Sequence, residues 1–304
     1  IVFGDWSSDV CSSDLGAGSV GTVYVKKRAD ESGTLFVDNG GTGGLSGWVE
    51  LVNEGAETLV IGDAVVVRAG GRMLSRGLIE FRREATVESS GWWRVEGSGV
   101  VVDGLVGVRS SSRMEVAGML EAAGGLVADG GTVSADKLVV TDLTLSNNGI
   151  VTTFAATTDA VHKLELEVAG TVAVDATSSI DVSGKGYLAG RTVGNTTEGG
   201  AQGMGGGSYG GQTACVVEGQ CSNRPYGQYW EADEWGSGGG GPAGGAGGGL
   251  VRIKAGRLVV NGTIQANGGT VGAAASGGGS GGGIDIRVMG VFEGTGQVQA
   301  NGGI

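Results

Sequence analysis

Several residue types that carry chemistry are scarce in this chain of 304 residues. It holds 2 prolines, 3 cysteines and 1 histidine, and aromatic residues make up 5% of it. One isolated histidine and so few cysteines cannot supply the ligand spacing of a zinc site, so we expect neither a metal nor a cofactor. The shortage of proline and the lack of a Gly-X-Y period exclude collagen.

Basic residues are also few, because 20 Lys and Arg face 32 Asp and Glu, for a net charge of −12. Nucleic-acid-binding proteins present clustered Lys and Arg, and this sequence has no basic patch with interleaved aromatics. We therefore expect no nucleic-acid partner. No apolar run approaches the roughly 20 residues that a membrane helix needs, so we expect no membrane-spanning segment.

Glycine is abundant instead, at 67 residues, about three times its usual share. Hydrophobic residues still make up 40% of the chain, which argues against wholesale disorder. The apolar residues fall in short runs between glycines, rich in β-branched side chains and too short for a helix with an apolar stripe.

Two copies of one pattern, Gly247–Gly269 and Gly281–Gly303, both end in Gln-Ala-Asn-Gly-Gly. Their runs alternate apolar and polar residues, as strands do, and a fixed period is the signature of stacked repeats. We predict an all-β fold, a parallel β-helix (solenoid) with glycine-rich loop insertions, in which Ile264 stacks on Val298. The closing Asn-Gly-Gly is expected to turn a corner with positive φ.

One part of the two copies does not align. At a constant spacing the apolar set beginning at Val251 is out of phase with the set beginning at Ile284, so we expect a bulge or a shifted corner between them. The same alignment places Arg252 opposite Ile286. It therefore predicts no outward charge that recurs at matching positions.

Weaker copies are predicted at Met114–Gly125, Leu138–Gly149 and Val172–Gly184, with Val116 and Val140 at matching places. These spacings indicate coils of roughly 20–24 residues with loops of varying length.

The chain divides into four predicted segments. Residues 5–15, DWSSDVCSSDL, fit nothing around them and resemble a translated sequencing-adapter remnant, so we treat 1–20 as an artefactual or disordered N-terminal segment. Residues 21–186 are predicted coils, 187–249 a glycine-rich insertion loop, and 250–304 further coils that are expected to continue beyond the sequence.

The insertion holds the candidate ligand-binding site. Aromatic faces stack on sugar rings and carboxylates bind sugar hydroxyls, so we predict glycan contact. The alternative is that the aromatics only pin the loop to its support. The candidates share a short stretch of the insertion: Tyr226, Tyr229, Trp230, Glu231, Asp233 and Trp235.

Two further motifs lie in the insertion. Cys215 and Cys221 are candidates for a local disulfide, which implies an oxidising compartment; the alternative is two free thiols. Ser208 lies in a G-x-S-x-G string, but that chemistry needs a helix after the serine and a histidine base. We predict no catalytic residue.

The strings GGGLVRIKAGRLVVNGTIQANGG, GGGSGGGIDIRV and GTVYV…TLFVDNGG carry a resemblance. With them the chain resembles glycine-rich β-helix segments of large bacterial surface and secreted proteins, namely adhesins and autotransporter passengers of the haemagglutinin type. The resemblance implies a non-enzymatic structural or adhesive role outside the cell or on its surface. Neighbouring coils of a longer chain, and glycans or other cell-surface ligands, are the implied partners.

The alternative is a polysaccharide-active enzyme, a lyase or glycoside hydrolase of the right-handed β-helix type. Such an enzyme needs acids or bases from neighbouring coils to converge on one outer face. The alignment of the two C-terminal copies offers no such convergence.

Overall fold

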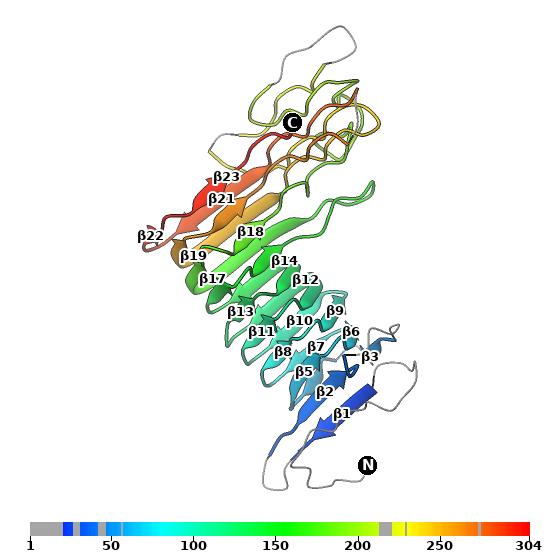
Figure 1. Ribbon diagram of the computed structural model, residues 1–304, viewed down its shortest axis with the longest axis vertical. Helices are drawn as coiled ribbons and strands as arrows, with labels where there is room; N and C mark the ends of the chain where they lie inside the picture. Colours follow the sequence, from blue (N-terminus) through cyan, green and yellow to red (C-terminus); the bar gives the residue numbers. More distant parts are fainter. Residues whose placement is uncertain are drawn as a thin grey trace. The chain divides into compact units, whose positions relative to one another are not determined.

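The computed structural model describes residues 21–26, 31–41, 47–55, 57–212, 221–228, 230–272 and 275–304. Every regular element in these ranges is a strand, β1 to β23 (Figure 1), so the all-β prediction is confirmed. The predicted artefactual segment 1–20 lies outside them. The chain forms two compact units, one holding residues up to Val151 with Val168–Ala173, the other holding Thr152–Glu167 and Val174–Ile304.

Most strands of the first unit pair in parallel with a strand of the next repeat, and Figure 1 shows β5 to β13 as successive rungs. The paired strands fall into three columns, and the long strands β12 and β14 each run through two of them. The first column contains β2 (Thr34–Asp38), β5 (Ala64–Arg68), β8 (Ala85–Val87), β11 (Val106–Arg109), β13 (Leu126–Asp129) and β15 (Leu143–Ser146). The second contains β3 (Val49–Val52), β6 (Arg72–Arg76), β9 (Trp92–Glu96), β12 (Arg113–Ala122) and β14 (Thr132–Val140). The third contains β4 (Leu59–Ile61), β7 (Ile79–Phe81) and β10 (Gly99–Val102), and then the later halves of β12 and β14.

An unbroken row of small apolar side chains fills the inside of the first column. Its members are in register from strand to strand and at most 1% exposed: Val37, Val67, Val87, Val108, Ala128 and Leu145. Side chains of a strand alternate between its two faces, so stacking in register places every inward residue on another. From Val67 to Ala128, the number of residues between successive members of the row agrees with the predicted coil of roughly 20–24 residues. The interval between Ala128 and Leu145 is shorter.

The corner after each strand of this column has a left-handed backbone. Pairs with positive φ recur there at Ala69-Gly70, Ser89-Ser90, Ser110-Ser111 and Asn147-Asn148. The corners also bond to one another, since the amide of Gly70 donates to the carbonyl of Ser89 at 3.1 Å. Only glycine and asparagine occupy this region cheaply, so the serines are held by the stack around them.

Two details of the first unit differ from the sequence prediction. β1 (Gly21–Val25) pairs antiparallel with β2, whereas the other strand pairs with a described register are parallel. Val116 and Val140 do not occupy matching places, because Val116 pairs with Ala135 and Val140 with Ala122. The repeat at this point is therefore shorter than the sequence spacing predicts.

The second unit has the same kind of parallel pairing. It includes β18 (Ser179–Asp181), β19 (Leu250–Val260), β20 (Thr263–Gln265), β21 (Gly283–Val288), β22 (Phe292–Glu293) and β23 (Gln297–Gln299). Two more strands, β16 (Ile150–Thr152) and β17 (Lys163–Val174), each have residues in both units. As predicted, Ile264 is in register with Val298. Ile264 is fully buried, while Val298 on the last described strand is 46% exposed.

The predicted shifted corner is confirmed between β19 and its partners. Val251 pairs with Ile284, and further along the strand Leu258 pairs with Phe292, so the offset between paired residue numbers grows by one. The second copy therefore carries one extra residue between its first two runs. This extra residue brings the inward apolar sets of the two copies back into phase.

The glycine-rich segments of the second unit form a bundle of extended chains joined by backbone hydrogen bonds. The amide of Gly245 donates to the carbonyl of Gly277 at 2.9 Å, and that of Gly247 to the carbonyl of Tyr187 at 2.8 Å. A Cβ on Gly245 would lie 1.9 Å from the carbonyl oxygen of Gly269. Any side chain there would force the chains apart, so glycine serves close approach in this bundle.

The closing Asn-Gly-Gly strings belong to this bundle. The prediction of a positive φ corner at Asn267 to Gly269 was wrong, since none of these residues has a positive φ. Gly268 instead donates its amide to the carbonyl of Asn301 at 2.8 Å, and a Cβ on Gly268 would lie 2.1 Å from the carbonyl oxygen of Gly279.

Candidate functional site

Two of the predicted glycan-contacting aromatics anchor the insertion. The Tyr226 hydroxyl donates to the carbonyl of Trp235 at 2.5 Å, and the indole Nε1 of Trp235 donates to the carbonyl of His162 at 2.6 Å. The ring of Trp235 lies 6.0 Å from that of Tyr187. Burial raises the pKa values of the Tyr187 and Tyr226 hydroxyls well above the ordinary value of 10.0. These contacts fit the alternative that the aromatics pin the loop.

The other predicted site residues face solvent. Trp230 is 66% exposed, and Glu231 and Asp233 are exposed. Tyr229 lies outside the described residues. The same insertion thus presents one set of candidates outward while the other set holds it in place.

The predicted disulfide falls partly outside the described residues. Cys221 is disulfide-bonded, but Cys215 and Cys11 lie outside the described ranges. The pairing of Cys215 with Cys221 therefore stays a prediction.

A buried polar network fixes the base of the insertion. Asn223 donates from Nδ2 to the carbonyl of Ser208 at 2.9 Å and accepts from the amide of Ser208 at 2.7 Å. The hydroxyls of Thr192 and Ser237 lie 2.8 Å apart, and that of Ser237 donates to the Tyr226 hydroxyl at 2.9 Å. Ser208 is fully buried, so its hydroxyl does not face a site open to substrate.

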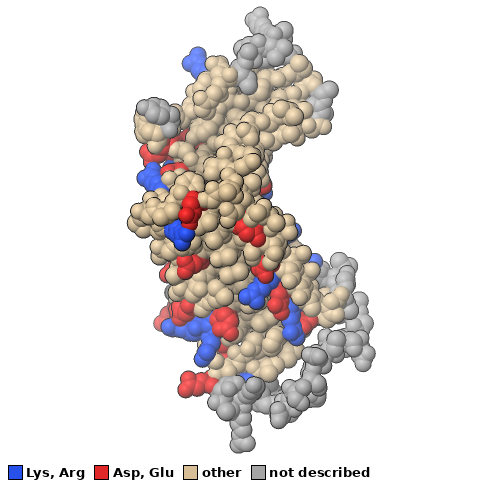
Figure 2. Space-filling view, turned by 60° about the vertical axis from the view of Figure 1, so that its left-hand side comes forward, with Lys and Arg blue, Asp and Glu red and all other residues tan. Residues whose placement is uncertain are grey.

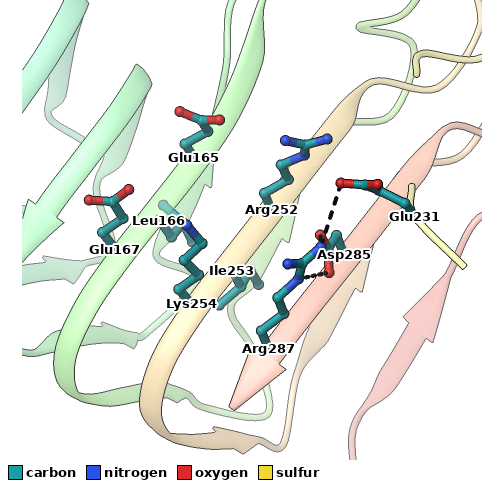
Figure 3. A pocket seen from close by; sticks show the side chains of 9 residues that line it. All are labelled: Glu165, Leu166, Glu167, Glu231, Arg252, Ile253, Lys254, Asp285 and Arg287. Atoms are coloured by element: carbon teal, nitrogen blue, oxygen red, sulfur yellow. Dashed lines mark hydrogen bonds and ion pairs between the residues drawn. The ribbon is translucent and has the colours of Figure 1, made fainter. Parts of the chain in front are cut away.

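Charged side chains from three neighbouring strands and the insertion converge beside this anchored loop (Figure 3). They surround a depression of about 100 Å³, which we call the charged cleft. Figure 3 shows that β17, β19 and β21 each place two charged side chains on one face. Glu231 reaches toward this face from the insertion. The charged residues of the cleft are Glu165, Glu167, Arg252, Lys254, Asp285, Arg287 and Glu231.

Several acids of the cleft have basic partners. Arg287 lies 2.9 Å from a carboxylate oxygen of Asp285 and 3.8 Å from one of Glu231. The hydrogen bond and charge of Asp285 raise the pKa of Arg287, so this guanidinium stays charged. Lys163 contacts Glu165 at 2.7 Å.

The two bases that β19 contributes to the cleft differ from Arg287. Within the described part of the chain, neither Arg252 nor Lys254 forms an ion pair, and the Nε of Arg252 is buried without a hydrogen-bond partner. A buried N–H group with no acceptor costs about 1–3 kcal/mol. The Arg252 side chain is therefore less well paired than that of Arg287.

The cleft was not predicted from the sequence because the constant-spacing alignment of the two copies was wrong at one point. Arg252 pairs with Asp285, and Lys254 pairs with Arg287, so charges do recur on the outer face. The apolar residues of the two copies do indicate the correct register. Aligning Val251 with Ile284 by their inward phase places Arg252 beside Asp285.

A second hollow of about 570 Å³, the tyrosine groove, lies where the insertion meets β21 and β23. The rings of Tyr209 and Tyr226 lie 5.3 Å apart there, and burial raises the pKa of the Tyr209 hydroxyl. The groove is mainly apolar, with Gln228 and Gln299 as polar lining residues.

Surface charge elsewhere is mixed. On the face that Figure 2 shows, basic and acidic side chains mostly lie near one another, and most of the visible surface is uncharged. Within the described ranges, no group of three or more His, Cys, Asp or Glu is placed to hold a metal, and no helix there could cross a membrane.

Comparisons with known proteins add no relative: no protein-family model, no curated protein and no solved structure matches the chain.

Proposed function

We propose that the chain is a parallel β-helix segment of an extracellular or cell-surface protein, with a non-enzymatic structural and adhesive role. The parallel columns support this proposal, since rows of buried side chains such as Val67 on Val87 and Ile180 on Ile264 stack repeat after repeat. Repeats of this kind bury their inner faces only against their neighbours. The stack would supply reach and rigidity.

The adhesive part of the proposal concerns the insertion. Its anchors, Tyr226 and Trp235, are held by hydrogen bonds, while Trp230 is exposed and Glu231 contacts Arg287 of the charged cleft. An exposed indole face suits stacking on a sugar ring, and the cleft offers donors and acceptors for hydroxyls. The observation that carries the proposal is this convergence of an anchored loop with a polar face of the stack.

Binding to a glycan array tests the proposal. The wild-type chain is expected to bind a subset of glycans, and Trp230→Ala is expected to abolish that binding while circular dichroism still shows a folded chain. Asp103→Asn, a substitution of an exposed acid in the first unit, is the matched control and is expected to bind as wild type. Wild-type protein that binds no glycan would overturn the adhesive role.

The convergence of charges also favours the second candidate, a polysaccharide lyase or hydrolase. The cleft brings Glu165, Arg252 and Asp285 from neighbouring strands to one outer face, which is the arrangement that such an enzyme needs. Incubation with acidic polysaccharides, followed by measurement of new reducing ends, decides between the two. The non-enzymatic role predicts no product; turnover lost in Glu231→Gln or Asp233→Asn would establish the enzyme instead.

A further inference from the structure

Some basic side chains of the charged cleft form ion pairs with its acids, and others do not. Arg287 contacts both Asp285 and Glu231, at 2.9 and 3.8 Å, and Lys163 contacts Glu165 at 2.7 Å. These contacts pair two bases with acids that line the cleft. The two bases that β19 contributes to the cleft, Arg252 and Lys254, have no such partner within the described residues.

Arg252 and Lys254 occupy alternate positions of β19 and lie on the same face (Figure 3). Residues two apart on a strand are about 7 Å from each other, so the two side chains can reach one small anion. Neither has an ion pair within the described residues, and the buried Nε of Arg252 lacks an acceptor. Arg252 is half-buried and Lys254 is exposed, and both line the cleft, so an anion in the cleft would meet the terminal guanidinium nitrogens and the ammonium group.

We infer that Arg252 and Lys254 form a subsite for the carboxylate of an acidic saccharide, an inference that rests on the proposed glycan-binding role. The planar guanidinium binds a carboxylate through paired hydrogen bonds, and the lysine adds a mobile point charge. A sugar with one carboxylate matches the two bases. Its ring hydroxyls can donate hydrogen bonds to the Asp and Glu carboxylates that line the cleft.

The surrounding acids distinguish a saccharide from an acidic peptide. Four carboxylates line the cleft, so a ligand with dense negative charge meets repulsion from them. A saccharide carries fewer charges and more hydroxyl donors.

Isothermal titration of the full chain with trigalacturonate tests the subsite, with its methyl ester as the neutral probe and a poly-aspartate peptide as the competing class. Arg252→Gln and Lys254→Gln are each expected to weaken trigalacturonate binding at least tenfold. Arg257→Gln, on the same strand but paired with Glu293, is the matched control and is expected to bind as wild type. Circular dichroism and the thermal midpoint verify that each variant folds, and Arg252→Lys, which keeps the charge, is expected to retain part of the affinity.

The results that would contradict the subsite differ from those that would contradict the proposed glycan-binding function. Equal binding by wild type and both Gln variants, or tighter binding of the methyl ester, would overturn the subsite while leaving glycan adhesion in place. Preference for poly-aspartate would show that the ligand is a peptide. Failure to bind trigalacturonate alongside binding to neutral glycans would remove the acidic specificity, and failure to bind any glycan would remove the proposed function itself.

Discussion

Arg252 on β19 lies in register with Asp285 on β21, a strand of the next repeat. Further along β19, where Leu258 pairs with Phe292, the offset between paired residue numbers has grown by one. The single extra residue keeps the apolar faces aligned and at the same time brings charged residues of neighbouring repeats together. The charged cleft is therefore a consequence of how the core is stacked.

Truncation of the buried column should cost far more than truncation of its exposed end. Ile264 is fully buried, and Val298, its partner in register, is 46% exposed. Ile264→Ala is expected to lower the free energy of unfolding by about 2–5 kcal/mol, and Val298→Ala by about 1 kcal/mol. Urea titration measures both. Equal losses would show that Ile264 is not part of a closed core.

The glycine bundle should reject a methyl group at its contacts. Gly245→Ala places a Cβ 1.9 Å from the carbonyl oxygen of Gly269 and is expected to cost about 1–3 kcal/mol of stability, as overpacking does. At Gly210 nothing lies within 4 Å of the added carbon, so Gly210→Ala is the matched control. If both variants unfold at the wild-type urea concentration, the chains of the bundle are not in contact.

The buried tyrosines predict a loss of stability at high pH. Burial, with the neighbouring charge of Glu234, raises the pKa of Tyr187 above its ordinary 10.0, so the unfolded chain releases this proton before the folded chain does. The stabilising effect is complete below pH 10 and is lost as the pH rises beyond it. Tyr187→Phe is therefore expected to flatten the fall in thermal midpoint above pH 10. Tyrosinate absorbance of the folded wild type should show fewer titrating tyrosines than that of the urea-unfolded chain; equal titration would contradict the burial.

The anchor of the insertion can be tested apart from its ligand. Trp235→Phe keeps a ring but removes the hydrogen bond from Nε1 to the carbonyl of His162. Loss of a bond worth about 1 kcal/mol is expected to speed amide exchange in the stretch around Trp235 roughly fivefold. Asp103→Asn, the exposed acid of the first unit, serves as the control and should leave exchange in this stretch unchanged. Identical exchange in all three proteins would mean that Trp235 does not hold the loop.

Much of the fold follows from local sequence patterns. Alternation of apolar and polar residues predicts strands such as β2 and β19, and the mismatch between Val251 and Ile284 predicts the shifted corner. Both inferences use the two-residue period of a strand, which depends on neighbouring residues alone. That is why they hold without knowledge of the tertiary structure.

Other features depend on contacts that the sequence does not encode locally. The role of Gly268 as a contact between chains depends on Gly279, and the match of Val140 with Ala122 depends on a shorter repeat at that point. The cleft was missed for the same reason, because its residues meet only once the register between repeats is known. Of the predicted site, Trp230 and Glu231 are exposed, whereas Tyr226 and Trp235 anchor the insertion.

The most direct test of the parallel stack is a methyl nuclear Overhauser experiment on isoleucine- and valine-labelled protein. Ile180, Ile264 and Val298 are successive members of one column, and neighbouring strands lie about 4.8 Å apart. Parallel stacking predicts strong cross-peaks from Ile180 to Ile264 and from Ile264 to Val298. Cross-peaks of Ile264 only to residues close in sequence, as in antiparallel hairpins, would contradict it.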